Sequence, residues 1–132
     1  MRTPFRNPFV ASIKAIAAIF VVVFALSTLT ACADQKIEMS KVTAVIDVRT
    51  PAEIAETGHL EGALTFDWQG PDFASQVNTL DKAGSYVVYC RSGNRAGQAI
   101  AWMEQNGFTG ELTNGGGLAD AQAATGLAIV AG

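Results

Sequence analysis

The chain has 132 residues, which leaves room for one domain and excludes two. Its nine basic residues are outnumbered by twelve acidic ones, and three of the nine precede Cys32, where no acidic residue lies. From Cys32 onward six bases therefore face twelve acids, and this balance excludes nucleic acid as an expected partner, because phosphate binding needs a basic surface.

Residues 1–32 are expected to be an export signal. Basic residues come first, an entirely apolar run from Ala15 to Leu26 follows, and small residues surround Cys32. The apolar run is short for a membrane span, so a transmembrane anchor is the less favoured alternative.

The end of this segment, Leu29-Thr30-Ala31-Cys32, resembles a bacterial lipobox, which implies that Cys32 is lipidated and anchors the mature protein to a membrane. The competing interpretation is an Ala31-Cys32-Ala33 site for ordinary signal peptidase, which would release a soluble protein. We expect an exported protein of the periplasm or cell envelope, with the lipid anchor as the favoured form.

Residues 33–41 are expected to be a polar linker with a short edge strand near Ile37, and residues 42–132 the single folded domain. Runs of β-branched and aromatic residues predict strands over Thr43–Val48, Ala63–Phe66, Ser85–Cys90 and Glu111–Thr113. Caps and apolar spacing predict helices over Pro51–Thr57, from Asp72 as a capping residue through Leu80, over Arg95–Asn106 and over Leu118–Ala124. This alternation predicts an α/β domain with a mostly parallel central sheet flanked by helices.

Cys90 ends the clearest predicted strand, a continuous run of aromatic and β-branched residues, and a glycine-containing loop and a helix follow it. Ligands of parallel sheets bind beyond the carboxyl ends of the strands. The loop amides and the positive end of the helix can form an anion-binding nest that favours the thiolate, and Arg91 and Arg95 would add positive charge. If Cys32 is lipidated or removed, no internal disulfide can form. The alternative without a function is that Cys90 is buried and inert, that Arg91 and Arg95 are solvated surface charges, and that Gly93 only permits a turn.

The loop Cys90-Arg91-Ser92-Gly93-Asn94-Arg95 resembles the active-site loop of rhodanese domains. The segment Asp47-Val48-Arg49, with Glu53 and then Gly58-His59-Leu60-Glu61-Gly62-Ala63, resembles the family's "DVR…E…GHIxGA" signature, and Asn114-Gly115-Gly116-Gly117-Leu118 resembles its C-terminal glycine segment. The resemblance covers roughly residues 42–129, and the small size with an export signal is similar to the periplasmic phage-shock type. Ala121 stands near a position where the family often has tryptophan, and Thr65-Phe66-Asp67 replaces the usual Asn-Ile-Pro.

The resemblance implies a rhodanese-like three-layer domain and a thiosulfate sulfurtransferase that needs no metal or cofactor. Cys90 would take sulfane sulfur from a small anionic donor such as thiosulfate, hold it as a persulfide and pass it to cyanide or a thiol. The substrate-binding residues carried over from the loop are Arg91, Ser92, Gly93, Asn94 and Arg95. Structural roles are implied for Asp47 and Arg49 as a charge pair, for Glu53 as a partner of Arg49, and for His59.

Two other functions remain open at this stage. Cysteine-dependent phosphatases and arsenate reductases also place a cysteine before an anion-binding loop and an arginine. Those phosphatases resemble C-x5-R, however, whereas Cys90 and Arg95 give C-x4-R, a smaller loop. The second alternative is a non-enzymatic sulfur-binding or redox-sensing module of the envelope, because a fold and a loop do not name the acceptor.

Overall fold

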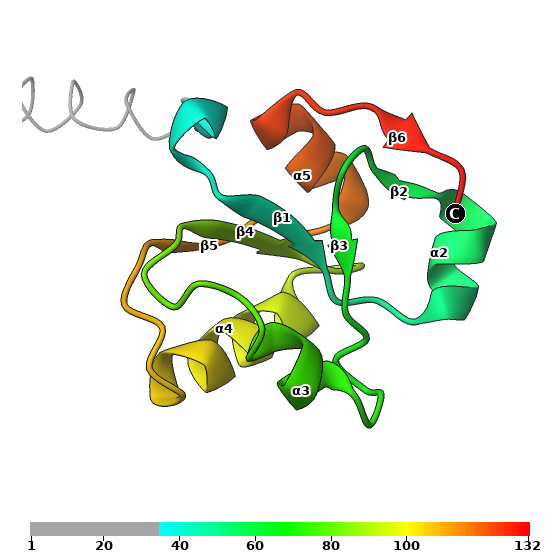
Figure 1. The fold of residues 1–132 in the computed structure, drawn as a ribbon. Helices are drawn as coiled ribbons and strands as arrows, with labels where there is room; N and C mark the ends of the chain where they lie inside the picture. The colour runs from blue at the N-terminus through cyan, green and yellow to red at the C-terminus, as the bar shows by residue number, and fades with distance from the viewer. Residues whose placement is uncertain (1–34) are drawn as a thin grey trace, which may run out of the picture. The chain divides into compact units, whose positions relative to one another are not determined.

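The computed structural model describes residues 35–132. Its regular elements are a 3₁₀ turn (Met39–Lys41), β1 (Ala44–Asp47), α2 (Pro51–Thr57), β2 (His59–Leu60), β3 (Leu64–Thr65), α3 (Phe73–Val77), β4 (Tyr86–Tyr89), α4 (Asn94–Gln105), β5 (Leu112–Asn114), α5 (Leu118–Thr125) and β6 (Ile129–Val130). Strands β3, β1, β4 and β5 form, in that order, a parallel sheet, and β2 pairs with β6 in a small antiparallel sheet (Figure 1). The predicted α/β architecture is therefore confirmed.

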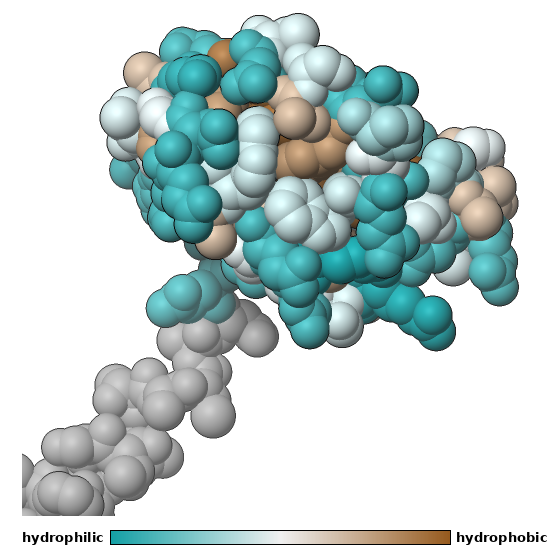
Figure 2. All heavy atoms as spheres, turned by 90° about the horizontal axis from the view of Figure 1, so that it is seen from below, coloured by the Kyte–Doolittle hydropathy of each residue, from teal (hydrophilic) through white to brown (hydrophobic). Residues whose placement is uncertain are grey.

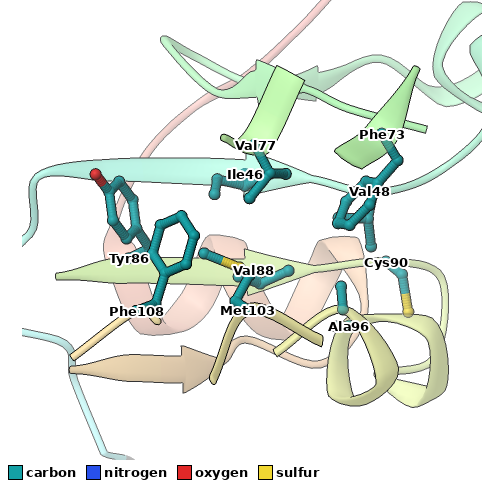
Figure 3. Close-up of a cluster of buried hydrophobic side chains, with 11 residues drawn as sticks. Ile46, Val48, Phe73, Val77, Tyr86, Val88, Cys90, Ala96, Met103 and Phe108 are labelled. Carbon is teal, nitrogen blue, oxygen red and sulfur yellow. The ribbon is translucent and has the colours of Figure 1, made fainter. Parts of the chain in front are cut away.

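Alternate residues of the central strands face two different core clusters, as the two-residue period of a strand requires. On one side Ile46 and Val88 pack with side chains from α3 and α4, among them Phe73 and Met103 (Figure 3). On the other side the cluster contains Val45, Val87, Tyr89, Leu60 and Ala121, the last from α5. The sheet is thus the middle of three layers.

The outer surface is mostly polar. Seen from below, the molecule shows a small apolar area among hydrophilic residues (Figure 2). Within residues 35–132, Ile129 is the only exposed large apolar side chain, at 39 % exposure. In the same part of the chain, no helix combines the length and the apolar character that a membrane crossing needs. The predicted export signal and Cys32 lie outside the described residues.

Helix α2 begins and ends where the sequence predicts, because its signals are local. Thr50 and Glu53 form a reciprocal capping box, Pro51 occupies the first turn, and Gly58 ends the helix with a φ of +78°. The four predicted strands are all present, and each differs from its predicted range by one residue at each end.

Three local predictions were wrong. Ile37 forms no strand: its amide donates to the carbonyl oxygen of Ala124, and its side chain packs on the second cluster, so this part of the expected linker lies against the domain. Asp72 precedes α3, but its side chain makes no capping hydrogen bond, because its backbone is already helical with φ −97° and ψ −2°. Helix α3 ends at Val77, and Leu80 lies in the following turn, where it still packs against the core.

Candidate active site

Cys90 follows β4 directly and lies beside Ala96 of α4, at the carboxyl end of the sheet (Figure 3). Its side chain is fully buried. The sulfur accepts a hydrogen bond from the amide of Gly93 at 3.0 Å, and the amide of Cys90 itself donates to the carbonyl oxygen of Gly116, also at 3.0 Å. Gly93 has a φ of +90°, a left-handed conformation that glycine adopts without steric cost.

Several backbone amides stabilise the ionised form of the thiol. Burial alone raises the pKa of Cys90, but the nearby backbone amides of Ala96, Ser92, Gly93 and Arg95 outweigh it and lower the pKa below the ordinary value. Of these amides, that of Gly93 makes the hydrogen bond to the sulfur. Since the thiolate is the nucleophilic form, this loop prepares the sulfur for reaction. The positive end of α4, which begins at Asn94, acts in the same direction.

The side chain of Arg95 binds Glu53 and not an open anion site. Nη1 donates to Oε2 and Nη2 to Oε1, both at 2.8 Å, so the pair is bidentate. This contact with Arg95 holds the pKa of Glu53 at about 2. The expectation that Glu53 pairs with Arg49 was wrong, because Glu53 reaches from the first turn of α2 to α4, while Arg49 is bound elsewhere.

Arg49 and Asp47 form a buried charge pair, with 3 % and 0 % of the side chains exposed. Arg49 Nη2 lies 2.6 Å from Asp47 Oδ2, and Nε donates to both carboxylate oxygens. The guanidinium also donates to Thr57 Oγ1 and to the carbonyl oxygen of Gly58. The pair therefore ties the end of β1 to the end of α2, which is a structural role.

The remaining predicted site residues have separate surroundings. Arg91 and Ser92 are exposed, and Asn94 Oδ1 accepts a hydrogen bond from Gln98 Nε2 at 2.9 Å. His59 lies in β2, with Nδ1 2.8 Å from the carbonyl oxygen of Leu60, so it belongs to the small antiparallel sheet and not to the loop around the sulfur. Within residues 35–132 no group of three or more His, Cys, Asp or Glu side chains is arranged to hold a metal ion.

Asn114 and the three glycines that follow it pack against the loop that contains Cys90, a role that the sequence did not reveal. A Cβ on Gly117 would lie 2.6 Å from the carbonyl oxygen of Arg91, so only glycine fits there without a shift of the loop. Asn114 donates from Nδ2 to the carbonyl oxygen of Gly93 and accepts from the amide of Gly116, both at 2.9 Å. In the sequence, the only indication of this role is that Asn114 directly precedes three glycines. That position does not reveal which residues its side chain contacts.

Comparisons with known proteins agree with this geometry. The model of the family described as "Rhodanese-like domain" matches residues 30–124. The chain is 36 % identical over 97 residues to a sulfurtransferase of Allochromatium vinosum, covering 74 % of this chain and 87 % of that protein. It is 32 % identical over 75 residues to the thiosulfate sulfurtransferase PspE of Escherichia coli, covering 57 % and 70 %.

A solved structure described as a rhodanese with anions from E. coli has a similar fold. Its TM-score is 0.54 at 31 % identity, and the match covers 67 % of this chain and 98 % of that one. Sulfur transfer is the activity class that these likenesses support. The family match spans most of the chain and includes the loop around Cys90, and the chain belongs to the rhodanese-like domain family.

Proposed function

We propose that the protein is a thiosulfate sulfurtransferase in which Cys90 carries sulfane sulfur as a persulfide. The observation that carries the proposal is a buried sulfur that accepts a hydrogen bond from the Gly93 amide, in a loop whose backbone amides lower the pKa of the thiol. The same amides can stabilise the negative charge of a persulfide one atom further out.

The reaction proceeds in two displacements. The Cys90 thiolate attacks the sulfane sulfur of thiosulfate, the sulfur–sulfur bond of the donor breaks, and its electron pair leaves with sulfite. A cyanide ion or an acceptor thiolate then attacks the outer sulfur of the persulfide. The bond to Sγ breaks, its electron pair returns to Cys90 as thiolate, and the product is thiocyanate or a persulfide of the acceptor. No metal, cofactor or external oxidant enters either step.

Arg91 is the loop cation that we assign to attracting the anionic donor. Glu53 neutralises Arg95, whereas Arg91 is exposed and forms no ion pair within the described part of the chain. Because residues 35–132 are otherwise rich in acidic side chains, a free guanidinium at the loop gives a dianion a local point of attraction.

The two alternatives differ from this proposal in what they need from the loop. A phosphatase needs an arginine that is free to hold a tetrahedral oxyanion, and Arg95 is held by Glu53 at both nitrogens. A sulfur-binding or redox-sensing module needs a reactive thiol but no turnover.

Intact-mass analysis after exposure to thiosulfate tests the proposal, with Cys90→Ser as the matched control. We expect one added sulfur atom on the native protein, none on the variant, and thiocyanate release when cyanide follows. Added sulfur without turnover to cyanide or thiols would favour the binding module. An unmodified protein that hydrolyses an aryl phosphate would contradict sulfur transfer.

We further propose that the protein is exported and held at a membrane by a lipid on Cys32, as the lipobox-like segment suggests. Cys32→Ala should then move the protein from the membrane fraction to the soluble fraction of the producing cell. A native protein that is already soluble would favour ordinary signal peptidase cleavage, and unchanged membrane association of the variant would contradict lipidation.

A further inference from the structure

One side chain closes a circuit of hydrogen bonds around Cys90. The amide of Gly93 donates to the sulfur at 3.0 Å, and the carbonyl oxygen of Gly93 accepts from Asn114 Nδ2 at 2.9 Å. On the other side, Asn114 Oδ1 accepts from the amide of Gly116 at 2.9 Å, and the carbonyl oxygen of Gly116 accepts from the amide of Cys90 at 3.0 Å. The circuit starts at the sulfur of Cys90 and returns to the amide of the same residue.

Asn114 contacts Gly93, the loop residue whose backbone has the most conformational freedom. Gly93 adopts φ +90°, and without a Cβ its backbone can take many other conformations. A hydrogen bond to its carbonyl oxygen restrains the peptide that follows it, and therefore restrains the turn that directs its amide at the sulfur. The same carbonyl oxygen accepts the amide of Gly97, which links this restraint to the start of α4.

Asparagine has the chemistry that the position requires. Its short side chain carries one donor group and one acceptor, and here the donor meets a carbonyl oxygen while the acceptor meets an amide. Aspartate would keep the acceptor for Gly116 but turn a charged oxygen toward the carbonyl oxygen of Gly93. Alanine would lose both contacts.

We propose that Asn114 is a positioning residue that holds the Gly93 turn in the conformation that stabilises the Cys90 thiolate. The role rests on the proposed function only in taking Cys90 as the reactive thiol. Asn114 acts through the backbone of the loop, because its side chain bonds to Gly93 and Gly116 and not to the sulfur.

The test is the pKa of the Cys90 thiol, measured from the pH dependence of alkylation by iodoacetamide. Asn114→Ala should raise this pKa by about half a unit to one unit, which corresponds to the loss of one ordinary hydrogen bond. Asn114→Asp should raise it further, because it also places a negative charge beside the loop. Asn78→Ala, an exposed asparagine at the end of α3, is the matched control and should leave the pKa unchanged.

The pKa separates positioning from a merely structural role, which would change the stability of the fold but not the titration of the thiol. Folded Asn114→Ala and Asn114→Asp proteins with the native thiol pKa would overturn the proposal. If the alanine variant does not fold, Asn114→Ser decides, since serine is uncharged and its shorter side chain lacks the Nδ2 donor to Gly93. Alkylation needs no sulfur donor, so a shifted pKa in a protein that fails to take sulfur from thiosulfate would refute the proposed function and leave the role of Asn114 intact.

Discussion

The contact between Glu53 and Arg95 joins the helix after β1 to the loop after β4, and Glu53→Gln removes its charge while keeping its shape. Glutamine also suits the third position of a capping box, so the start of α2 should survive. The substitution therefore isolates the ion pair with Arg95.

The expected size follows from the pKa of Glu53. Arg95 first, and then hydrogen bonds from Thr50, lower it from 4.5 to about 2, and this whole difference corresponds to about 3 kcal/mol at about 1.4 kcal/mol per pKa unit, which is an upper bound for the contact with Arg95. The Glu53 side chain is 24 % exposed, so solvent screening reduces the contribution, and we expect Glu53→Gln to lower the free energy of unfolding by about 1–3 kcal/mol near neutral pH.

The pH dependence has a definite sign. Because the pKa of Glu53 is lower in the folded protein than in the unfolded chain, its contribution is complete above about pH 5 and is lost as the pH falls toward about 2. Urea unfolding of the native protein and the variant should show a difference that shrinks between neutral pH and about pH 3. Glu56→Gln, an exposed glutamate of the same helix, is the control. An equal difference at both pH values, or none at neutral pH, would refute the reasoning.

Three further outcomes are expected. Asp47→Asn leaves the buried charge of Arg49 without its partner and should lower the free energy of unfolding, measured by urea titration, by about 3–5 kcal/mol. A loss below about 1 kcal/mol would contradict the structural role of the pair. Gly117→Ala places a Cβ against the carbonyl oxygen of Arg91, forces the loop to shift and should therefore slow alkylation of the thiol. Circular dichroism should still show the native helix content. Unchanged alkylation would show that the loop does not depend on this close contact. In the native protein, alkylation of Cys90 should reach half its maximal rate below the ordinary thiol value of pH 9.0, and a midpoint at or above that value would contradict a stabilised thiolate.

Much of this fold could be read from short stretches of sequence. The boundaries of α2 follow from Thr50, Pro51 and Gly58, which lie within nine consecutive residues and act through contacts inside the helix. The loop that contains Cys90 could be predicted equally well, because the cysteine, the glycine and the start of the helix lie within five consecutive residues, 90–94. Wherever the hydrogen-bonding partners are close in sequence, their pattern predicts the structure.

Other features depended on contacts between distant segments. Strands β2 and β6 have two residues each, too few for a periodic pattern, and each exists because the other lies beside it. The contacts of Glu53 with Arg95 and of Asn114 with Gly93 span 42 and 21 residues. The sequence by itself determined the elements, the parallel class of the sheet and the reactive loop. Only the strand order β3-β1-β4-β5 decided which side chains hold that loop, because it brings the carboxyl ends of β1, β4 and β5 to one edge.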